Sequence, residues 1–136
     1  MICGMIGLGR IGGNLSLHAM EKGHQVVGYS KSDEELNSLK NKGLEPAESI
    51  QSLVDKLESP RIIFLYIPHG DPTEEVCAEL TQCLKSGDIV VDGGNSHWKK
   101  SVSRYEEFKE RGVHFLDCGT SGGIEGAREG ACFMVE

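Results

Sequence analysis

The sequence predicts an α/β fold of the Rossmann type, a doubly wound and mainly parallel sheet with helices on both faces. Two observations favour this class: apolar segments of strand length alternate with segments of helical period, and a glycine-rich turn follows the first strand. The chain has 136 residues, about the size of one domain. We therefore expect residues 1–136 to form a single domain around one sheet.

The first half of the chain begins with two strand–helix units. Residues 3–6 form a short apolar strand, and the apolar stripe after them predicts a helix. Residues 24–29 form the second strand. Ser32 and Glu35 have the spacing of a capping box, which predicts a helix that begins at Ser32 and ends near Gly43.

The middle of the chain contains the most apolar segment. Residues 50–57 have helical period, and Pro60 separates them from the run 61–67. Such a continuous apolar run is typical of a strand buried on both faces, so we expect a central strand. Asp71-Pro72-Thr73-Glu74 then predicts a new helix, with Asp71 as its N-cap and Pro72 as its first residue.

The last third continues the alternation. Strands are predicted at residues 88–92 and 113–117, with a charged helix at 97–111 between them. Residues 119–130 are rich in glycine and show no period, so no regular element is predicted there. A final apolar strand covers residues 131–135.

Charge and hydropathy exclude several classes of partner. The formal net charge is −7 and the pI is about 5.2, which disfavours binding to the phosphate backbone of nucleic acids. The longest apolar run, residues 62–67, is far shorter than the ~20 residues of a membrane span. We expect a cytoplasmic protein that binds neither nucleic acid nor membrane.

The five cysteines give no sign of a disulfide framework or a metal site. Their number is odd, and no two of them form a CxxC pair. We expect free thiols, mostly buried as small apolar side chains, and no metal. The cysteines are Cys3, Cys77, Cys83, Cys118 and Cys132.

The turn after the first strand has the GxGxxG pattern of a dinucleotide-binding loop. Gly7 permits a tight turn, Gly9 lets a pyrophosphate approach the backbone, and Gly12 lets the helix pack closely on the strand. Arg10 either lies along the pyrophosphate or points into solvent, and the alternative for the whole segment is a plain strand–helix turn. The predicted pyrophosphate-binding residues are Gly7, Leu8, Gly9, Arg10, Ile11 and Gly12.

The end of the second predicted strand bears on the choice between NAD and NADP. Sites that bind NAD usually have an acid about 20 residues beyond the glycine loop, which bonds the ribose 2′-hydroxyl. Here that position reads Ser30-Lys31-Ser32, two hydroxyls around a cation, which suits the 2′-phosphate of NADP. The alternative is that Ser30 and Ser32 only form a turn and cap the next helix. The sequence favours NADP slightly.

Two further turns follow predicted strands at the sheet edge where such folds bind ligands. Asp92-Gly93-Gly94-Asn95-Ser96 offers an amide that can both donate and accept hydrogen bonds. Thr120-Ser121-Gly122-Gly123 offers hydroxyls beside backbone amides, which suits a carboxylate or hydroxyl of a substrate. Either segment could instead be a simple turn.

Taken in order, these motifs resemble the decarboxylating 6-phosphogluconate dehydrogenases, a family within the β-hydroxyacid dehydrogenases. The resemblance covers nearly the whole chain and looks most like the shorter bacterial branch, which often uses NAD. Ser30 stands where that branch has an acid, so NAD and NADP both stay open. The motifs are GLGRIG (7–12), IPHGDPTEEV (67–76), DIVVDGGNSHWK (88–99) and FLDCGTSGGIEGAREG (115–130).

The resemblance implies roles for further residues. Ile67, Pro68 and His69 would bind the dinucleotide near the nicotinamide, although the family often has a small residue at the position of His69, and an exposed loop histidine is the alternative. Asn95 would contact both cofactor and substrate. Residues 121–123 match the family's substrate-binding segment, which here is Ser121, Gly122 and Gly123.

The resemblance also implies a reaction, the oxidation and decarboxylation of 6-phosphogluconate to ribulose 5-phosphate in the pentose phosphate pathway. In the family, which forms homo-oligomers, a general-base lysine and a general-acid glutamate come from a helical domain that would follow Glu136. Lys99 and Lys100 are expected to be surface residues. We therefore expect this chain to bind the cofactor without turnover. Another β-hydroxyacid dehydrogenase and a free-standing dinucleotide-binding module are the alternatives.

Overall fold

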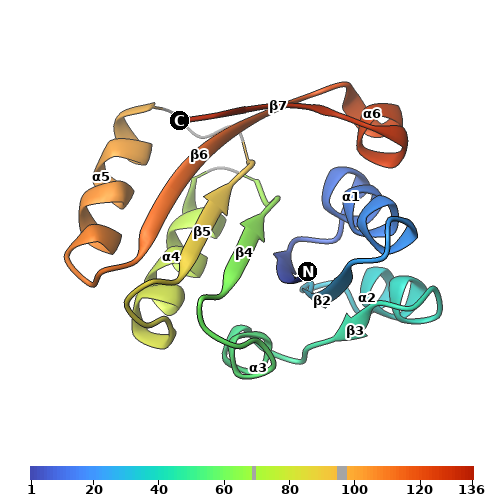
Figure 1. Cartoon of the computed structure of the whole chain (residues 1–136), viewed down its shortest axis with the longest axis horizontal. Helices are drawn as coiled ribbons and strands as arrows, with labels where there is room; N and C mark the ends of the chain where they lie inside the picture. Colours follow the sequence, from blue (N-terminus) through green and yellow to red (C-terminus); the bar gives the residue numbers. More distant parts are fainter. Residues whose placement is uncertain (69, 95–97) are drawn as a thin grey trace.

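The computed structural model describes residues 1–68, 70–94 and 98–136, which form a seven-stranded sheet with helices on both faces (Figure 1). The strands are β1 (Ile2–Ile6), β2 (Gln25–Tyr29), β3 (Glu45–Pro46), β4 (Ile62–Leu65), β5 (Ile89–Asp92), β6 (His114–Ser121) and β7 (Cys132–Val135). The helices are α1 (Arg10–Glu21), α2 (Asp33–Lys40), α3 (Ile50–Asp55), α4 (Asp71–Cys83), α5 (Trp98–Lys109) and α6 (Gly123–Glu129).

The strand order is β3-β2-β1-β4-β5-β6-β7. All neighbouring strands are parallel except β6 and β7, which are antiparallel. The chain thus winds outward from β1 in one direction through β2 and β3, and then in the other direction through β4, β5 and β6. This order is that of the Rossmann-type doubly wound fold and confirms the predicted class.

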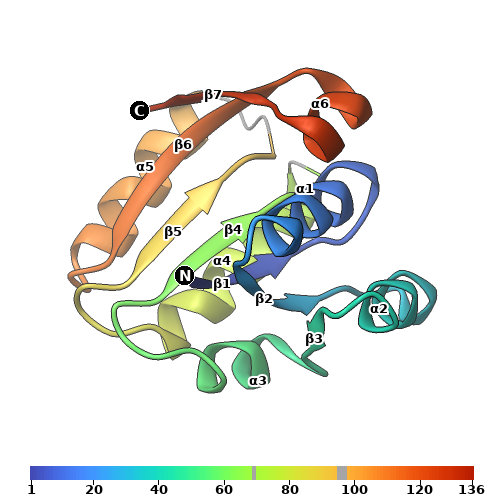
Figure 2. The ribbon, with the colours of Figure 1, turned by 45° about the vertical axis from the view of Figure 1, so that its right-hand side comes forward.

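Two buried cores lie on opposite faces of the sheet. Val26 and Leu39 belong to the core under α1 and α2, whereas Leu53, Leu80 and Phe108 belong to the core under α3, α4 and α5. The last helix, α6, packs beside α1 (Figures 1 and 2). No helix formed by the described residues is long and apolar enough to cross a lipid bilayer.

Residues 119–130 form regular structure, so the sequence-based expectation for them was wrong. Strand β6 continues through Ser121 because β7 pairs with it, with Ser121 opposite Cys132. Gly122, with φ +120°, ends the strand and is the N-cap of α6. Ala127 of this short helix is fully buried, so tertiary packing stabilises a helix that the glycine-rich sequence does not predict.

The start of α4 and the edge strand β3 also differ from expectation. Gly70, with φ +96°, is the N-cap of α4, and Asp71 is the first helical residue rather than the cap. Strand β3 has two residues, too few to give a periodic signal, and pairs with β2. The Ala47 N–H extends this pairing by donating to the Gly28 carbonyl at 2.8 Å.

Candidate functional site

A cleft of about 370 Å³ opens at the carboxyl ends of β1, β2 and β4. The chain leaves β1 toward α1 on one face of the sheet and leaves β4 toward α4 on the other, so the cleft lies at the point where the winding direction reverses. Open α/β sheets bind ligands at this point. The described residues that line the cleft include Gly7, Leu8, Gly9, Tyr29, Ser30, Lys31, Ser32, Glu35, Tyr66, Ile67 and Pro68.

The glycine turn confirms the close packing predicted from its spacing. Gly7 has φ +97°, which favours glycine, and a Cβ there would overlap the Tyr66 carbonyl oxygen. A Cβ at Gly12, in the first turn of α1, would overlap the Gly7 carbonyl oxygen. The fold itself therefore requires both glycines.

Gly9 is different, because neither its backbone conformation nor its contacts within the protein require glycine. Its φ of −72° suits any residue. Among the described residues beyond its chain neighbours, a Cβ there would meet just the Glu35 Oε2 atom, at 3.6 Å. The space in front of the Gly9 backbone is thus open to the cleft.

Helix α1 begins at this opening without a side-chain cap. Gly9 is its N-cap and makes no side-chain hydrogen bond to the first turn, and the first turn contains no acid. The first N–H groups of an α-helix have no intrahelical partners and favour an anion. The first turn of α1 is therefore suited to a phosphate. Arg10 and Ile11 belong to this turn but do not line the cleft, and Arg10 is exposed.

Ser30 and Ser32 are already engaged within the protein. The Ser30 hydroxyl donates to Glu35 Oε1 at 3.1 Å and accepts from the Ser32 N–H at 3.1 Å. The Ser32 hydroxyl accepts from the Glu35 N–H at 3.3 Å and so caps α2, as predicted. The Glu35 carboxylate bonds Ser30 instead of returning to the Ser32 N–H, so the full reciprocal capping box does not form.

Lys31 extends across the mouth of the cleft. Its Nζ lies 3.7 Å from Glu75 Oε2 of α4, and the two side chains are 73% and 69% exposed. An exposed pair of this kind contributes little to stability because water screens it. Lys31 lines the cleft and has an acidic partner that the sequence did not reveal.

The end of β4 forms the other wall. Ile67 and Pro68 line the cleft, and the buried Thr73 hydroxyl donates to the Pro68 carbonyl at 2.8 Å. This bond ties the wall to the first turn of α4. His69, predicted from the resemblance to lie here, is outside the described residues.

A second cleft of about 470 Å³ adjoins the first and is lined by Tyr66 and Ile67 as well. Gly93, Gly94 and Thr120 also line it, so the two motif-bearing turns meet here. Of the predicted substrate residues 121–123, which are all exposed, Gly123 lines this cleft, whereas Ser121 and Gly122 do not. Asn95 lies outside the described residues.

Tyr66 separates the two clefts, and sequence reasoning missed it. Its Oη lies 2.8 Å from Thr120 Oγ1, a bond between the ends of β4 and β6. Burial raises the pKa of the Tyr66 phenol, which therefore stays protonated at neutral pH. A Cβ on Gly93 would overlap the Tyr66 ring, so a side chain there would displace the ring from its hydrogen bond with Thr120. The glycine at position 93 was the available signal that a large group lies opposite.

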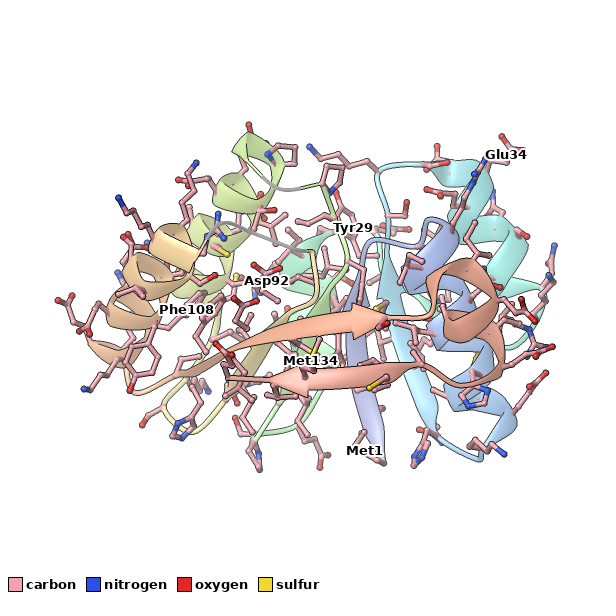
Figure 3. The ribbon with its side chains drawn as sticks, turned by 90° about the horizontal axis from the view of Figure 1, so that it is seen from above. Met1, Tyr29, Glu34, Asp92, Phe108 and Met134 are labelled. Atoms are coloured by element: carbon pink, nitrogen blue, oxygen red, sulfur yellow. The ribbon has the colours of Figure 1, made fainter. Side chains whose placement is uncertain are left out.

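A buried ion pair supports the turn after β5. Arg104 of α5 donates to Asp92 Oδ2 at 3.3 Å, and the two side chains are 5% and 0% exposed. Asp92 Oδ1 accepts from the Gly94 N–H at 2.9 Å. Asp92, labelled in Figure 3 at the end of β5, thus fixes the backbone that lines the second cleft.

The remaining predicted groups lie on the surface or in the cores. Lys99 and Lys100 are exposed, as expected, and Lys100 pairs with Glu74 at 3.3 Å. All five cysteines are free thiols. Within residues 1–68, 70–94 and 98–136, no group of three or more His, Cys, Asp or Glu side chains could hold a metal ion.

Comparisons with known proteins agree with this geometry. A model of the NAD binding domain of 6-phosphogluconate dehydrogenase matches residues 2–136. The NAD(+)-dependent, decarboxylating 6-phosphogluconate dehydrogenase of Haloferax volcanii is 42% identical over 135 residues, which cover 99% of this chain and 44% of the relative. The decarboxylating 6-phosphogluconate dehydrogenase of Candida albicans is 42% identical over 136 residues, which cover 96% of this chain and 26% of the relative.

A solved structure is also similar to this chain. The 6-phosphogluconate dehydrogenase of Plasmodium falciparum, described in its apo form and in complexes with NADP+ and with 6-phosphogluconate, superposes with a TM-score of 0.93 at 31% identity. The match covers 99% of this chain and 30% of that one. The chain spans less than half the length of each of these three proteins.

Proposed function

The chain belongs to the family of NAD-binding domains of 6-phosphogluconate dehydrogenase, and on this premise we propose that it binds NAD or NADP in the cleft at the carboxyl ends of β1, β2 and β4. We propose further that it does so as part of an enzyme that oxidises and decarboxylates 6-phosphogluconate to ribulose 5-phosphate in the pentose phosphate pathway.

The environment of Gly9 is the observation that carries the proposal. Backbone strain or packing explains Gly7 and Gly12, but neither explains Gly9. A glycine that the fold does not need, at the uncapped start of a helix and facing a cleft, is what close approach of a ligand phosphate requires. The residues therefore fit a dinucleotide.

The proposed contacts follow the walls of the cleft. Residues 7–12 would hold the pyrophosphate at the start of α1, and residues 30–32 would lie against the adenosine ribose. Ile67 and Pro68 would pack near the nicotinamide, as would His69. The bound nicotinamide would accept the hydride, and this chain's residues would position it and exclude water from it.

The substrate is proposed to bind in the second cleft. Asn95 and residues 121–123 are assigned to it by the resemblance, and the position of Gly123 in the wall supports that assignment. The Tyr66 phenol and the Thr120 hydroxyl offer hydrogen bonds at the junction of the two clefts. A polyhydroxylated phosphosugar acid suits such a polar junction beside the nicotinamide.

Isothermal titration calorimetry with NAD+ and with NADP+ tests the proposal. We expect at least one of them to bind the wild-type chain, and we expect Gly9→Val to abolish binding because its side chain would occupy the pyrophosphate position. The φ of Gly9 is open to residues other than glycine, and a Cβ there would meet no described atom beyond its chain neighbours closer than Glu35 Oε2 at 3.6 Å, so we expect the variant to fold, and thermal unfolding checks this. Undiminished affinity in a folded Gly9→Val variant would disprove this placement of the pyrophosphate.

A further inference from the structure

We propose that Glu35 makes this cleft select NAD over NADP, by accepting a hydrogen bond from the 2′-hydroxyl of the adenosine ribose. The inference rests on the proposed dinucleotide binding and goes beyond it, because it names the cofactor and the residue that chooses it. It also reverses the slight preference for NADP that the sequence indicates.

The position of the Glu35 carboxylate is the first argument. Glu35 is the third residue of α2, yet its side chain reaches back to the end of β2, where Oε1 accepts from the Ser30 hydroxyl at 3.1 Å. Its Oε2 lies 3.6 Å from the point where a Cβ on Gly9 would stand. The carboxylate thus spans the gap between β2 and the glycine turn. In NAD-binding folds the acid that bonds the ribose occupies this gap, although it usually comes from the strand end itself.

The state of the Ser30 hydroxyl is the second argument. A serine hydroxyl has a single proton, and Ser30 donates that proton to Glu35. While this bond persists, Ser30 can offer a phosphate no hydrogen bond. The Ser32 hydroxyl accepts from the Glu35 N–H and keeps its own proton, which either dinucleotide could use. The pair of hydroxyls that favoured NADP in the sequence is therefore reduced to one donor.

The charge around the cleft is the third argument. Among the described residues that line it, Lys31 and Glu35 are charged, and the Glu75 carboxylate lies 3.7 Å from the Lys31 ammonium and offsets part of its charge. A 2′-phosphate carries about two negative charges and would stand beside the Glu35 carboxylate, which repels it. A 2′-hydroxyl carries no charge and can donate to the same carboxylate.

Glu35→Gln is the informative variant, and Glu34→Gln is its matched control. Glutamine keeps the size of the side chain and can still bond Ser30, but it removes the negative charge. Glu34 lies in the same helical turn, loses the same charge on substitution, and is exposed at the periphery of the molecule without lining the cleft (Figure 3). The comparison separates a contact within the site from a general change in surface charge.

Calorimetric titration of the full chain with NAD+ and NADP+ measures the ratio of the two dissociation constants. We expect the wild type to bind NAD+ at least ~10-fold more tightly, as one charged hydrogen bond allows. Glu35→Gln should shift the ratio toward NADP+ by a similar factor, because NAD+ loses a charged hydrogen-bond acceptor and NADP+ is no longer repelled. Glu34→Gln should leave the ratio within about twofold of the wild type, as expected for a screened surface charge.

Adenosine fragments give a test that needs no variant. We expect 5′-AMP to bind the wild-type chain more tightly than 2′,5′-ADP, which differs from it by the 2′-phosphate. Equal or tighter binding of 2′,5′-ADP, tighter binding of NADP+ than of NAD+, or equal shifts in the two variants would overturn the role of Glu35 and leave dinucleotide binding intact. Binding of neither dinucleotide would overturn the proposed function and this inference with it.

Discussion

The three glycines of the turn after β1 belong to one sequence motif, but each position is glycine for a different physical reason. Position 7 requires glycine because its φ is positive and a Cβ would overlap the Tyr66 carbonyl oxygen. Position 12 requires glycine because a Cβ would overlap the Gly7 carbonyl oxygen. Gly9 has an ordinary φ and open space. Substitution should therefore separate stability from binding within one short turn.

Gly7→Ala should destabilise the fold by about 2 kcal/mol or more, because alanine rarely adopts a positive φ and its Cβ would overlap the neighbouring strand end. Gly9→Ala should cost about 1 kcal/mol or less, because alanine is a poorer N-cap than glycine but meets no close contact there. Urea denaturation of both variants measures the difference. Equal losses of stability would show that Gly9 also has a structural role.

The cysteines should differ sharply in reactivity. Burial raises the pKa of the Cys77 thiol to about 12 and also raises the pKa of Cys3, Cys118 and the half-buried Cys83, whereas Cys132 of β7 is exposed. Because the thiolate is the reactive form, we expect one rapidly modified thiol per native chain at neutral pH. Titration with a chromogenic disulfide reagent counts it, and Cys132→Ser should remove it. A fast phase that persists in this variant would point to local opening of a buried site.

At the scale of elements, Asp88 joins two loops at the amino ends of β4 and β5. Its fully buried carboxylate accepts from the Arg61 N–H at 2.8 Å, the Lys85 N–H at 2.8 Å and the Ser59 hydroxyl at 2.9 Å, and it pairs with the Arg61 guanidinium at 3.1 Å. These bonds fix the start of β4 against the turn that leads into β5. One acid far from the cleft thus holds the amino ends of the two central strands together.

Asp88→Asn should destabilise the protein by about 3 kcal/mol, because the largely buried Arg61 loses its charged partner. Urea denaturation at neutral pH measures this loss. Asp55→Asn is the control, since Asp55 makes its hydrogen bond to Gln51 at an exposed position and should change stability little. A loss as small as that of the control would contradict the structural role of Asp88.

Asp88 should also make stability depend on acid pH. Burial by itself raises the pKa of this carboxyl, but the hydrogen bonds from Arg61, Lys85 and Ser59 outweigh it, so the net pKa is lowered. A lowered pKa gives stability that is fully present above the ordinary value of ~3.9 and is lost as the pH falls through the folded-state value. Urea midpoints at several acid pH values should therefore fall more steeply for the wild type than for Asp88→Asn. Parallel profiles would assign the acid sensitivity to other carboxyls.

At the scale of the whole molecule, the proposed cofactor cleft adjoins the proposed substrate cleft. Tyr66 and Ile67 line both clefts, so the two sites share a boundary at the end of β4. The relatives named for the complete reaction are more than twice as long as this chain. The resemblance assigns proton transfer to lysine and glutamate residues of a helical domain in those proteins.

A polypeptide of these 136 residues should therefore bind the dinucleotide without reducing it when 6-phosphogluconate is added. Positioned acid or base groups typically contribute ~10²–10⁴-fold to such rates. Absorbance of the reduced nicotinamide measures turnover, and a full-length relative is the positive control. Turnover that disappears in Lys99→Ala or Lys100→Ala would show that these surface lysines act in catalysis.

Much of the fold was predictable because its signals are local. The apolar run that ends at Ile67, the punctuation by glycine and proline, and the cap at Ser32 each depend on residues close in sequence. The helix α6 was not predictable, because Ala127 is buried by contacts that the glycine-rich sequence does not encode locally. The extension of β6 through Ser121 likewise depends on a partner strand that follows α6.

The sequence by itself determined most of the strands and helices, the glycine turn and the family resemblance, because each depends on the spacing of residues along the chain. Only the tertiary structure decided which groups meet across the clefts. It brought Glu35 back to Ser30 and toward Gly9, paired Lys31 with Glu75, and placed Tyr66 against Thr120, 54 residues away. The physical reason is that a cofactor preference depends on which charged groups and unused hydrogen-bond donors face the cleft, and these are set by the three-dimensional fold. A hydroxyl that looks available in the sequence is already donating its proton in the fold.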